Sequence, residues 1–141
     1  MFTGGTNRGW GSRGKNPFSF QRVNWTGKVP FEVHEMRAMP DGFELTFTQP
    51  ADKKTLADNT SYAMESYTYI YQKGYGSPEV DQSEPVIKKA IPAKDGKSVR
   101  LKINGMVKGN VHELKMEGIR RKGIDQPLLH DVAYYTLNEI P

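Results

Sequence analysis

The feature that most constrains the fold is a pair of alternating runs joined by a tight turn. Residues 31–39 (FEVHEMRAM) alternate in polarity and are followed by Pro-Asp-Gly at 40–42, which are typical turn residues. The next run, residues 43–48, places three apolar side chains on one face: Phe43, Leu45 and Phe47. Two alternating runs across such a turn predict a β-hairpin.

The rest of the chain continues this pattern at close spacing. Further strands are expected at 61–72, 86–91, 98–103, 111–117 and 128–138. In one of these runs the alternation predicts that Val99, Leu101 and Ile103 point inward, and in another His112, Leu114 and Met116 share a face. The stretch Ala51–Leu56 predicts one helical turn with Leu56 as a plug into the core, and no segment keeps a helical period over three turns. About seven closely spaced strands predict an all-β fold, an immunoglobulin-like antiparallel β-sandwich with an extended N-terminal leader.

Charge and composition divide the chain near residue 28. Residues 1–28 hold five basic side chains and no acid, whereas residues 29–141 hold 15 basic and 16 acidic side chains. We therefore expect a leader and linker at 1–28 and the sandwich domain at 29–141, with 21–30 as a short edge segment ending in a turn. The Gly-rich basic leader leaves a nucleic-acid contact open, with Trp10 stacking on bases. The balanced body does not predict a nucleic-acid reader.

Two features are absent from the sequence, and each absence excludes some classes of function. The chain has no cysteine, which excludes disulfides, thiolate nucleophiles and c-type haem attachment within it. It also lacks an apolar run near the ~20 residues of a membrane helix, and it lacks a signal-peptide pattern, so no membrane insertion is expected.

Catalytic patterns are missing as well. His34, His112 and His130 lie in three different predicted strands, and none has a partner at a metal-ligand spacing. We expect each to be a partly buried, hydrogen-bonded strand residue. Nucleophile and phosphate-loop motifs are absent, so the chain is predicted not to be an enzyme, with no metal and no cofactor.

Tyrosines supply the candidate interaction residues. Tyr67, Tyr69 and Tyr71 share one face of a predicted strand at period two, and Tyr75 follows in a Gly/Pro loop. Three interpretations stay open for this face: a platform that stacks a sugar ring, a contact with a neighbouring domain, or core packing. The candidate ligand or domain-interface residues are Tyr67, Tyr69, Tyr71, Tyr75 and Trp10.

The loop after this strand, residues 73–85, is predicted to be a rigid structural loop. It carries Glu79, Asp81 and Glu84, which are oxygen donors that calcium accepts. The Asp-x-Asp-x-Asp-Gly spacing of a calcium loop is absent, so rigidity is the better explanation.

Four stretches together resemble one protein family: GGTNRGWGSRG at 4–14, PDGFELTFTQPAD at 40–52, YGSPEVD at 75–81 and LLHDVAYYTLNEIP at 128–141. They are similar to the C-terminal part of large exported bacterial proteins built around a glucose/sorbosone-dehydrogenase-like β-propeller. Many members of that family also carry a c-type haem domain.

The resemblance implies that residues 4–14 correspond to the end of a final propeller blade, marked by Arg8-Gly9-Trp10. It implies that 29–141 is the sandwich that follows, in a periplasmic or extracellular setting. The implied function is a non-catalytic accessory domain that packs on the upstream propeller or on a partner. A carbohydrate-binding module that uses the tyrosine face is the alternative, and a nucleic-acid contact through the leader is a second one. The family's redox chemistry belongs to domains outside this chain, so no catalytic residue carries over.

Overall fold

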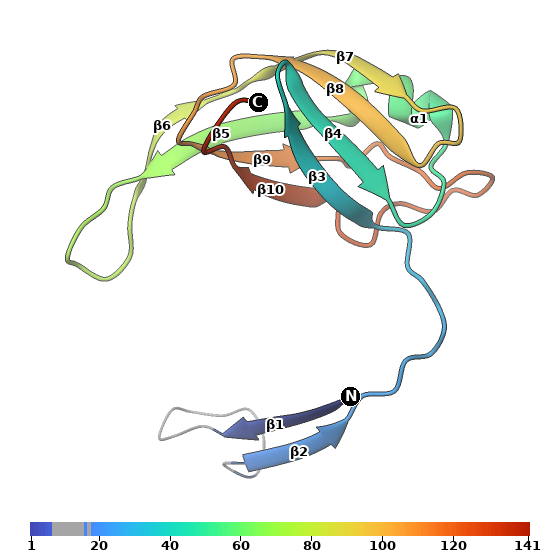
Figure 1. Ribbon diagram of the computed structural model, residues 1–141, viewed down its shortest axis with the longest axis vertical. Coiled ribbons are helices and arrows are strands. Elements are labelled where there is room, and N and C mark those ends of the chain that lie inside the picture. The colour runs from blue at the N-terminus through green and yellow to red at the C-terminus, as the bar shows by residue number, and fades with distance from the viewer. Residues whose placement is uncertain (7–15, 17) are drawn as a thin grey trace.

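A computed structural model of the chain describes residues 1–6, 16 and 18–141. Within them the chain forms an N-terminal hairpin and a β-sandwich of two sheets (Figure 1). The strands are β1 (Phe2–Thr6), β2 (Phe18–Arg22), β3 (Val33–Met39), β4 (Gly42–Phe47), β5 (Ala63–Tyr69), β6 (Glu79–Ser83), β7 (Val86–Pro92), β8 (Ser98–Asn104), β9 (Val111–Lys115) and β10 (Val132–Thr136). Two short helical elements, α1 (Lys53–Ala57) and the 3-10 turn η1 (Asn59–Ser61), connect β4 to β5.

The two sheets have the strand arrangement of an immunoglobulin domain. One has the order β3-β4-β8-β7 and the other the order β10-β9-β5-β6, and all neighbours are antiparallel. In immunoglobulin nomenclature these are the A-B-E-D sheet and the G-F-C-C′ sheet. The predicted all-β, immunoglobulin-like sandwich is confirmed.

The core lies between the sheets, and the alternation of each strand determines which residues enter it. The apolar residues predicted on β4, β8 and β9 are all buried, as is Met116 directly after β9. Leu56 on α1 is also fully buried, so its predicted role as a plug is confirmed. The core cluster consists of Phe31, Ala38, Phe43, Leu45, Phe47, Ala51, Leu56, Tyr62, Met64, Ala90, Val99, Leu101, Ile103, Leu114, Met116, Ile119, Leu128 and Leu137.

Three predicted elements differ from the structure. The loop predicted at 73–85 contains β6, so among the described residues the sandwich has eight strands rather than seven. The strand predicted from residue 128 begins only at Val132, because Leu128 turns inward as a core plug. The predicted edge segment at 21–30 is also wrong after Arg22, since residues 23–30 form no strand.

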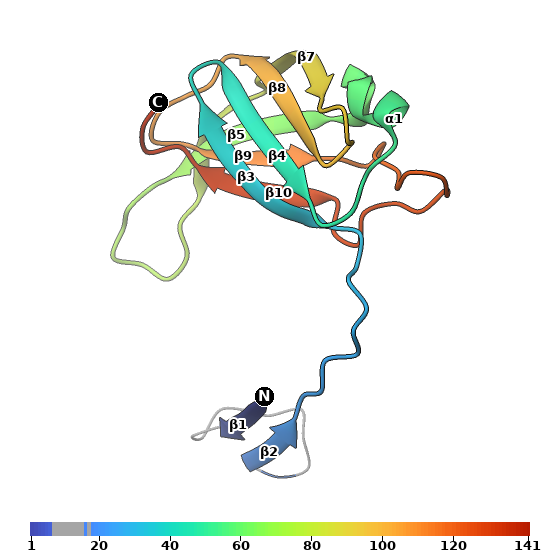
Figure 2. The ribbon, with the colours of Figure 1, turned by 45° about the vertical axis from the view of Figure 1, so that its right-hand side comes forward.

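The N-terminal hairpin pairs β1 with β2 in an antiparallel register, with Phe2 opposite Arg22. Residues 23–30 join it to the sandwich, and both ribbon views show it apart from the two sheets (Figures 1 and 2). In the part of the chain that the structure describes, no helix is long and apolar enough to cross a membrane.

Candidate interaction surface

The candidate tyrosines occupy three different environments around β5. Met64, Ser66 and Thr68 alternate toward the core, so Tyr67 and Tyr69 lie on the outer face of the G-F-C-C′ sheet. Tyr71 and Tyr75 lie beyond the strand, in the loop 70–78, which we call the tyrosine loop. The shared face predicted for Tyr67, Tyr69 and Tyr71 therefore ends at Tyr69.

Tyr67 is buried although it faces outward. Only 6% of its surface is exposed, yet it is not part of the core cluster between the sheets. Tyr69 covers it edge to face, with ring centroids 5.6 Å apart and an interplanar angle of 83°. The Tyr67 hydroxyl donates to Glu113 Oε2 at 3.4 Å. Two rings at this angle do not make the single flat surface that sugar stacking at Tyr67 and Tyr69 requires.

Burial raises the pKa of the Tyr67 phenol above its usual range, and the neighbouring Tyr69 hydroxyl and the Glu113 carboxylate raise it further. Loss of solvation disfavours the phenolate, so Tyr67 stays protonated to a higher pH than an exposed tyrosine. It is therefore a structural hydrogen-bond donor on the outer face.

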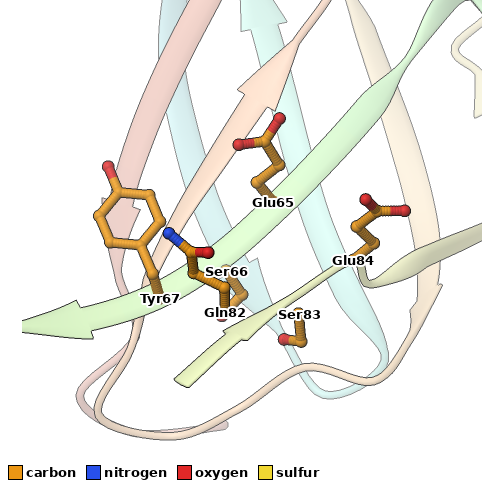
Figure 3. Close-up of a pocket in the computed structure, with 6 residues that line it drawn as sticks. All are labelled: Glu65, Ser66, Tyr67, Gln82, Ser83 and Glu84. Carbon is orange, nitrogen blue, oxygen red and sulfur yellow. The ribbon is translucent and has the colours of Figure 1, made fainter. Parts of the chain in front are cut away.

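A small cleft lies between β5 and β6, next to Tyr67. Its volume is about 190 Å³, and its lining residues are Glu65, Ser66, Tyr67, Gln82, Ser83 and Glu84. Figure 3 shows Tyr67, Glu65, Gln82 and Glu84 on one side of the strands, while Ser83 points away. Two carboxylates, an amide and a phenol suit hydrogen bonding to a small polar group or a cation.

The cleft owes its shape to a bulge in the β5–β6 pair. Ser66 pairs with Ser83 and Thr68 with Val80, so two residues of β6 face one of β5. Asp81 in this bulge has a φ of 54°, a left-handed conformation that aspartate tolerates better than most residues. The bulge turns β6 and opens the space that Gln82 borders.

The charges beside the cleft are partly neutralised. Glu65 and Glu113 lie directly opposite each other on β5 and β9, which would be repulsive without a cation. Lys115 Nζ approaches Glu65 at 2.6 Å and Glu113 at 3.9 Å. The hydrogen bond to Glu65 raises the pKa of the Lys115 amine. Glu84, by contrast, forms no ion pair within the described residues.

The tyrosine loop projects from one end of the sandwich (Figures 1 and 2). Its two tyrosines, Tyr71 and Tyr75, are fully exposed. The loop is internally braced, because Gln72 Nε2 donates to the Gly76 carbonyl at 2.7 Å. The rigidity expected for residues 73–85 stays a prediction. Trp10, the fifth candidate, lies outside the described residues.

The histidines are spread over the domain. His112 is fully buried, and its ring lies 5.6 Å from that of Phe43. Its Nε2 accepts from the Val107 amide and its Nδ1 lies 3.3 Å from the Asn110 carbonyl, a pattern that suits the neutral Nδ1–H tautomer. Burial lowers the pKa of His112.

The prediction of partly buried strand histidines is wrong for the other two. His34 is an exposed residue of β3, and His130 is exposed in a bend, where it contacts Glu32 at 2.7 Å. Among the described residues, no three His, Asp or Glu side chains gather in a way that could hold a metal ion. The acids of the loop considered for calcium, Glu79, Asp81 and Glu84, are exposed and form no such group.

Two features escaped prediction from the sequence. The cleft depends on β6, whose EVDQS sequence has one apolar residue and no clear alternation. The hairpin strand β1 (FTGGT) contains two glycines, which are poor strand formers. A usable signal was the presence of three phenylalanines, Phe2, Phe18 and Phe20, in an otherwise Gly-rich and basic segment.

Comparisons with known proteins show the fold. No family model and no curated protein matches the chain. Among solved structures, the chain is similar to the N-terminal part of the bacterial S-layer protein SbsC, with a TM-score of 0.59 and 17% identity over 78% of this chain and 24% of that one. It is also similar to domains 1–6 of surface layer protein SbsC, with a TM-score of 0.56 and 14% identity over 77% of this chain and 14% of that one. The match to rSbsC(31-844) has a TM-score of 0.58 and 16% identity, and it covers 78% of this chain and 14% of that one. The chain thus spans about a quarter or less of these proteins.

Proposed function

We propose that the chain is a non-catalytic interaction domain of an exported, cell-surface protein with several domains. Its fold is similar to domains of a bacterial surface-layer protein, and in each match it corresponds to a small part of a longer chain. Many cell-surface domains share the β-sandwich architecture, which agrees with this role.

The main observation behind this proposal is the exposed N-terminal hairpin. Its phenylalanines Phe2, Phe18 and Phe20 are 64%, 71% and 79% exposed, and the rings of Phe2 and Phe20 stack at 5.5 Å. An isolated two-stranded hairpin is at best marginally stable in water. A hairpin that presents three aromatic rings to solvent is therefore built to be covered by another surface.

The proposed cover is the domain that precedes this chain in a longer polypeptide. Each strand of a two-stranded hairpin has one unpaired edge, which can extend a neighbouring sheet. The resemblance of residues 4–14 to the end of a propeller blade supports a β-propeller as that domain. Burial of the three rings would contribute about 4–6 kcal/mol, enough to dock the hairpin.

The test uses the preceding part of the natural polypeptide, produced as a separate protein. We expect it to bind the 141-residue chain in isothermal titration calorimetry. The double variant Phe18→Ser/Phe20→Ser should bind at least about 100-fold more weakly, as expected when two buried rings are lost.

The matched control is Ile124→Ser/Leu129→Ser, which removes two exposed apolar side chains from the sandwich. It should bind like the parent chain. Absence of binding by the parent, or equal loss in both double variants, would contradict the proposed docking.

A glycan-binding role for the tyrosine loop is the second candidate. Full exposure of Tyr71 and Tyr75 on a braced loop leaves both ring faces open for stacking on a sugar. On a glycan array, Tyr71→Ala and Tyr75→Ala should each abolish the signal of the parent, whereas Tyr134→Ala on β10 should not. A parent chain that binds no glycan would rule this candidate out.

A further inference from the structure

A second surface lies at the end of the sandwich opposite the tyrosine loop. Three segments meet there: residues 50–57 with α1, the β7–β8 turn 93–97, and the loop 118–127, which projects in Figures 1 and 2. Together they hold seven basic and three acidic side chains, a net charge of +4. The rest of residues 29–141 holds eight basic and thirteen acidic side chains, a net charge of −5. We call the three segments the basic end.

Backbone hydrogen bonds hold the segments together. The Ala51 amide donates to the Gly96 carbonyl at 2.9 Å, and the Asp52 amide donates to the Arg120 carbonyl at 2.8 Å. The Lys122 amide donates to the carbonyl of Pro50 at 3.0 Å. The cations are thus displayed on a connected framework, which reduces the entropy lost on binding.

The acids of the basic end are engaged locally. Asp52 Oδ1 accepts from the Lys54 amide at 2.7 Å, and Asp95 Oδ1 accepts from the Lys97 amide at 2.9 Å. Asp125 forms an ion pair with Arg120 at 3.0 Å.

The remaining cations of the basic end form no ion pair with another residue that the structure describes. Within the part of the chain that the structure describes, none of the other six basic side chains of this end has an acidic partner within 4.0 Å: Lys53, Lys54, Lys94, Lys97, Arg121 and Lys122. Five of them are exposed. Two hollows of about 410 and 230 Å³ indent the surface, and Lys54 lines both.

We propose that the basic end binds an anionic polysaccharide, a polymer whose sugars carry carboxylate, sulfate or phosphate groups. Several unpaired cations on a connected surface suit a chain of regularly spaced negative charges. The segments contain no aromatic residue on which a nucleobase could stack, and α1 has five residues, too few to fill a nucleic-acid groove. The surface is separate from the hairpin and from the tyrosine loop, so this proposal does not depend on the proposed function.

The test measures binding of the full 141-residue chain to heparin, a sulfated polysaccharide, at several salt concentrations. The parent should bind, with affinity that falls steeply as salt rises, because binding releases counterions from the polymer. Lys53→Glu/Lys54→Glu should weaken binding at least about tenfold and reduce the salt slope by about 2. A second variant, Lys94→Glu/Lys97→Glu, should do the same, which guards against misfolding of either one.

The control variant is Lys102→Glu/Lys108→Glu, which makes the same change of net charge at the opposite end and should bind like the parent. A second control, Arg22→Glu/Lys28→Glu, tests the basic leader. The proposal is overturned if the parent does not bind heparin, if the opposite-end control weakens binding equally, or if the leader variant abolishes it. Double-stranded DNA that binds as tightly as heparin, with the same dependence on Lys53 and Lys54, would also overturn it in favour of a nucleic-acid surface.

Discussion

Replacement of Leu56 by alanine tests how the short helix α1 is fixed to the sandwich. Leu56 is fully buried in the core cluster, although α1 has only five residues and little stability of its own. Helix α1 also carries Lys53 and Lys54 of the basic end. The Leu56 side chain is thus the buried side chain that attaches α1 to the core.

The expected cost follows from burial and cavity formation. Truncation of a fully buried leucine to alanine lowers the free energy of unfolding by about 3 kcal/mol, within a general range of about 2–5 kcal/mol. For a domain of this size the entropy of unfolding is about 0.3 kcal/mol/K, so the melting temperature should fall by about 10 °C.

The assay is thermal and urea unfolding followed by circular dichroism. Leu129→Ala is the matched control, because Leu129 is 63% exposed and its truncation should change stability by less than about 0.5 kcal/mol. A Leu56→Ala variant that melts within about 2–3 °C of the parent, or a Leu129→Ala variant equally destabilised, would refute the assignment of Leu56 to the core.

Three further predictions concern the body of the fold. Because burial lowers the pKa of His112 from its ordinary value of 6.5, the unfolded chain binds a proton there more readily than the folded one. The contribution of His112 to the free energy of unfolding should be complete above about pH 6.5 and should decline as the pH falls further. Urea unfolding at a series of pH values measures this decline. A His112→Gln variant with the same pH dependence would argue against His112 as its origin. Gly96→Ala should lower the free energy of unfolding by about 2–4 kcal/mol, because φ at Gly96 is +71° and a Cβ there would lie 2.7 Å from the Ala51 carbonyl oxygen. Gly123→Ala should lower it by only about 1 kcal/mol, because Gly123 has a φ of +82° but open space around it. A chain of residues 29–141 should fold alone and melt within about 10 °C of the parent in calorimetry, and a larger drop would show that the leader belongs to the domain.

Much of the sandwich could be predicted because its central strands bury one face only. On β4, β8 and β9 the alternation of apolar and polar residues is nearly unbroken, so the buried residues follow directly. Leu56 was predictable as a lone apolar residue in a polar segment.

The interaction surfaces were harder to predict, because they depend on long-range pairing. Alternation places Tyr67 and Tyr69 on one face of the strand, but it does not decide whether that face is the core, and it gives no sign that Tyr69 packs edge to face on Tyr67. The cleft requires β6, and its bulge at Asp81 follows from register, which local sequence does not determine. Likewise, the basic end gathers charges from three segments that are distant in sequence, and it does so only because Ala51, Gly96 and Arg121 meet in the fold.

The central claim is that the N-terminal hairpin docks on a preceding domain, and hydrogen exchange tests it most directly. Amide exchange would be measured by mass spectrometry in the 141-residue chain and in the polypeptide of natural length. We predict that β1 and β2 exchange rapidly in the shorter chain, since an uncovered two-stranded hairpin is marginally stable, while β4 and β8 are protected. In the longer polypeptide, β1 and β2 should gain at least about 100-fold protection. Equally rapid exchange of both strands in the two proteins would contradict the claim.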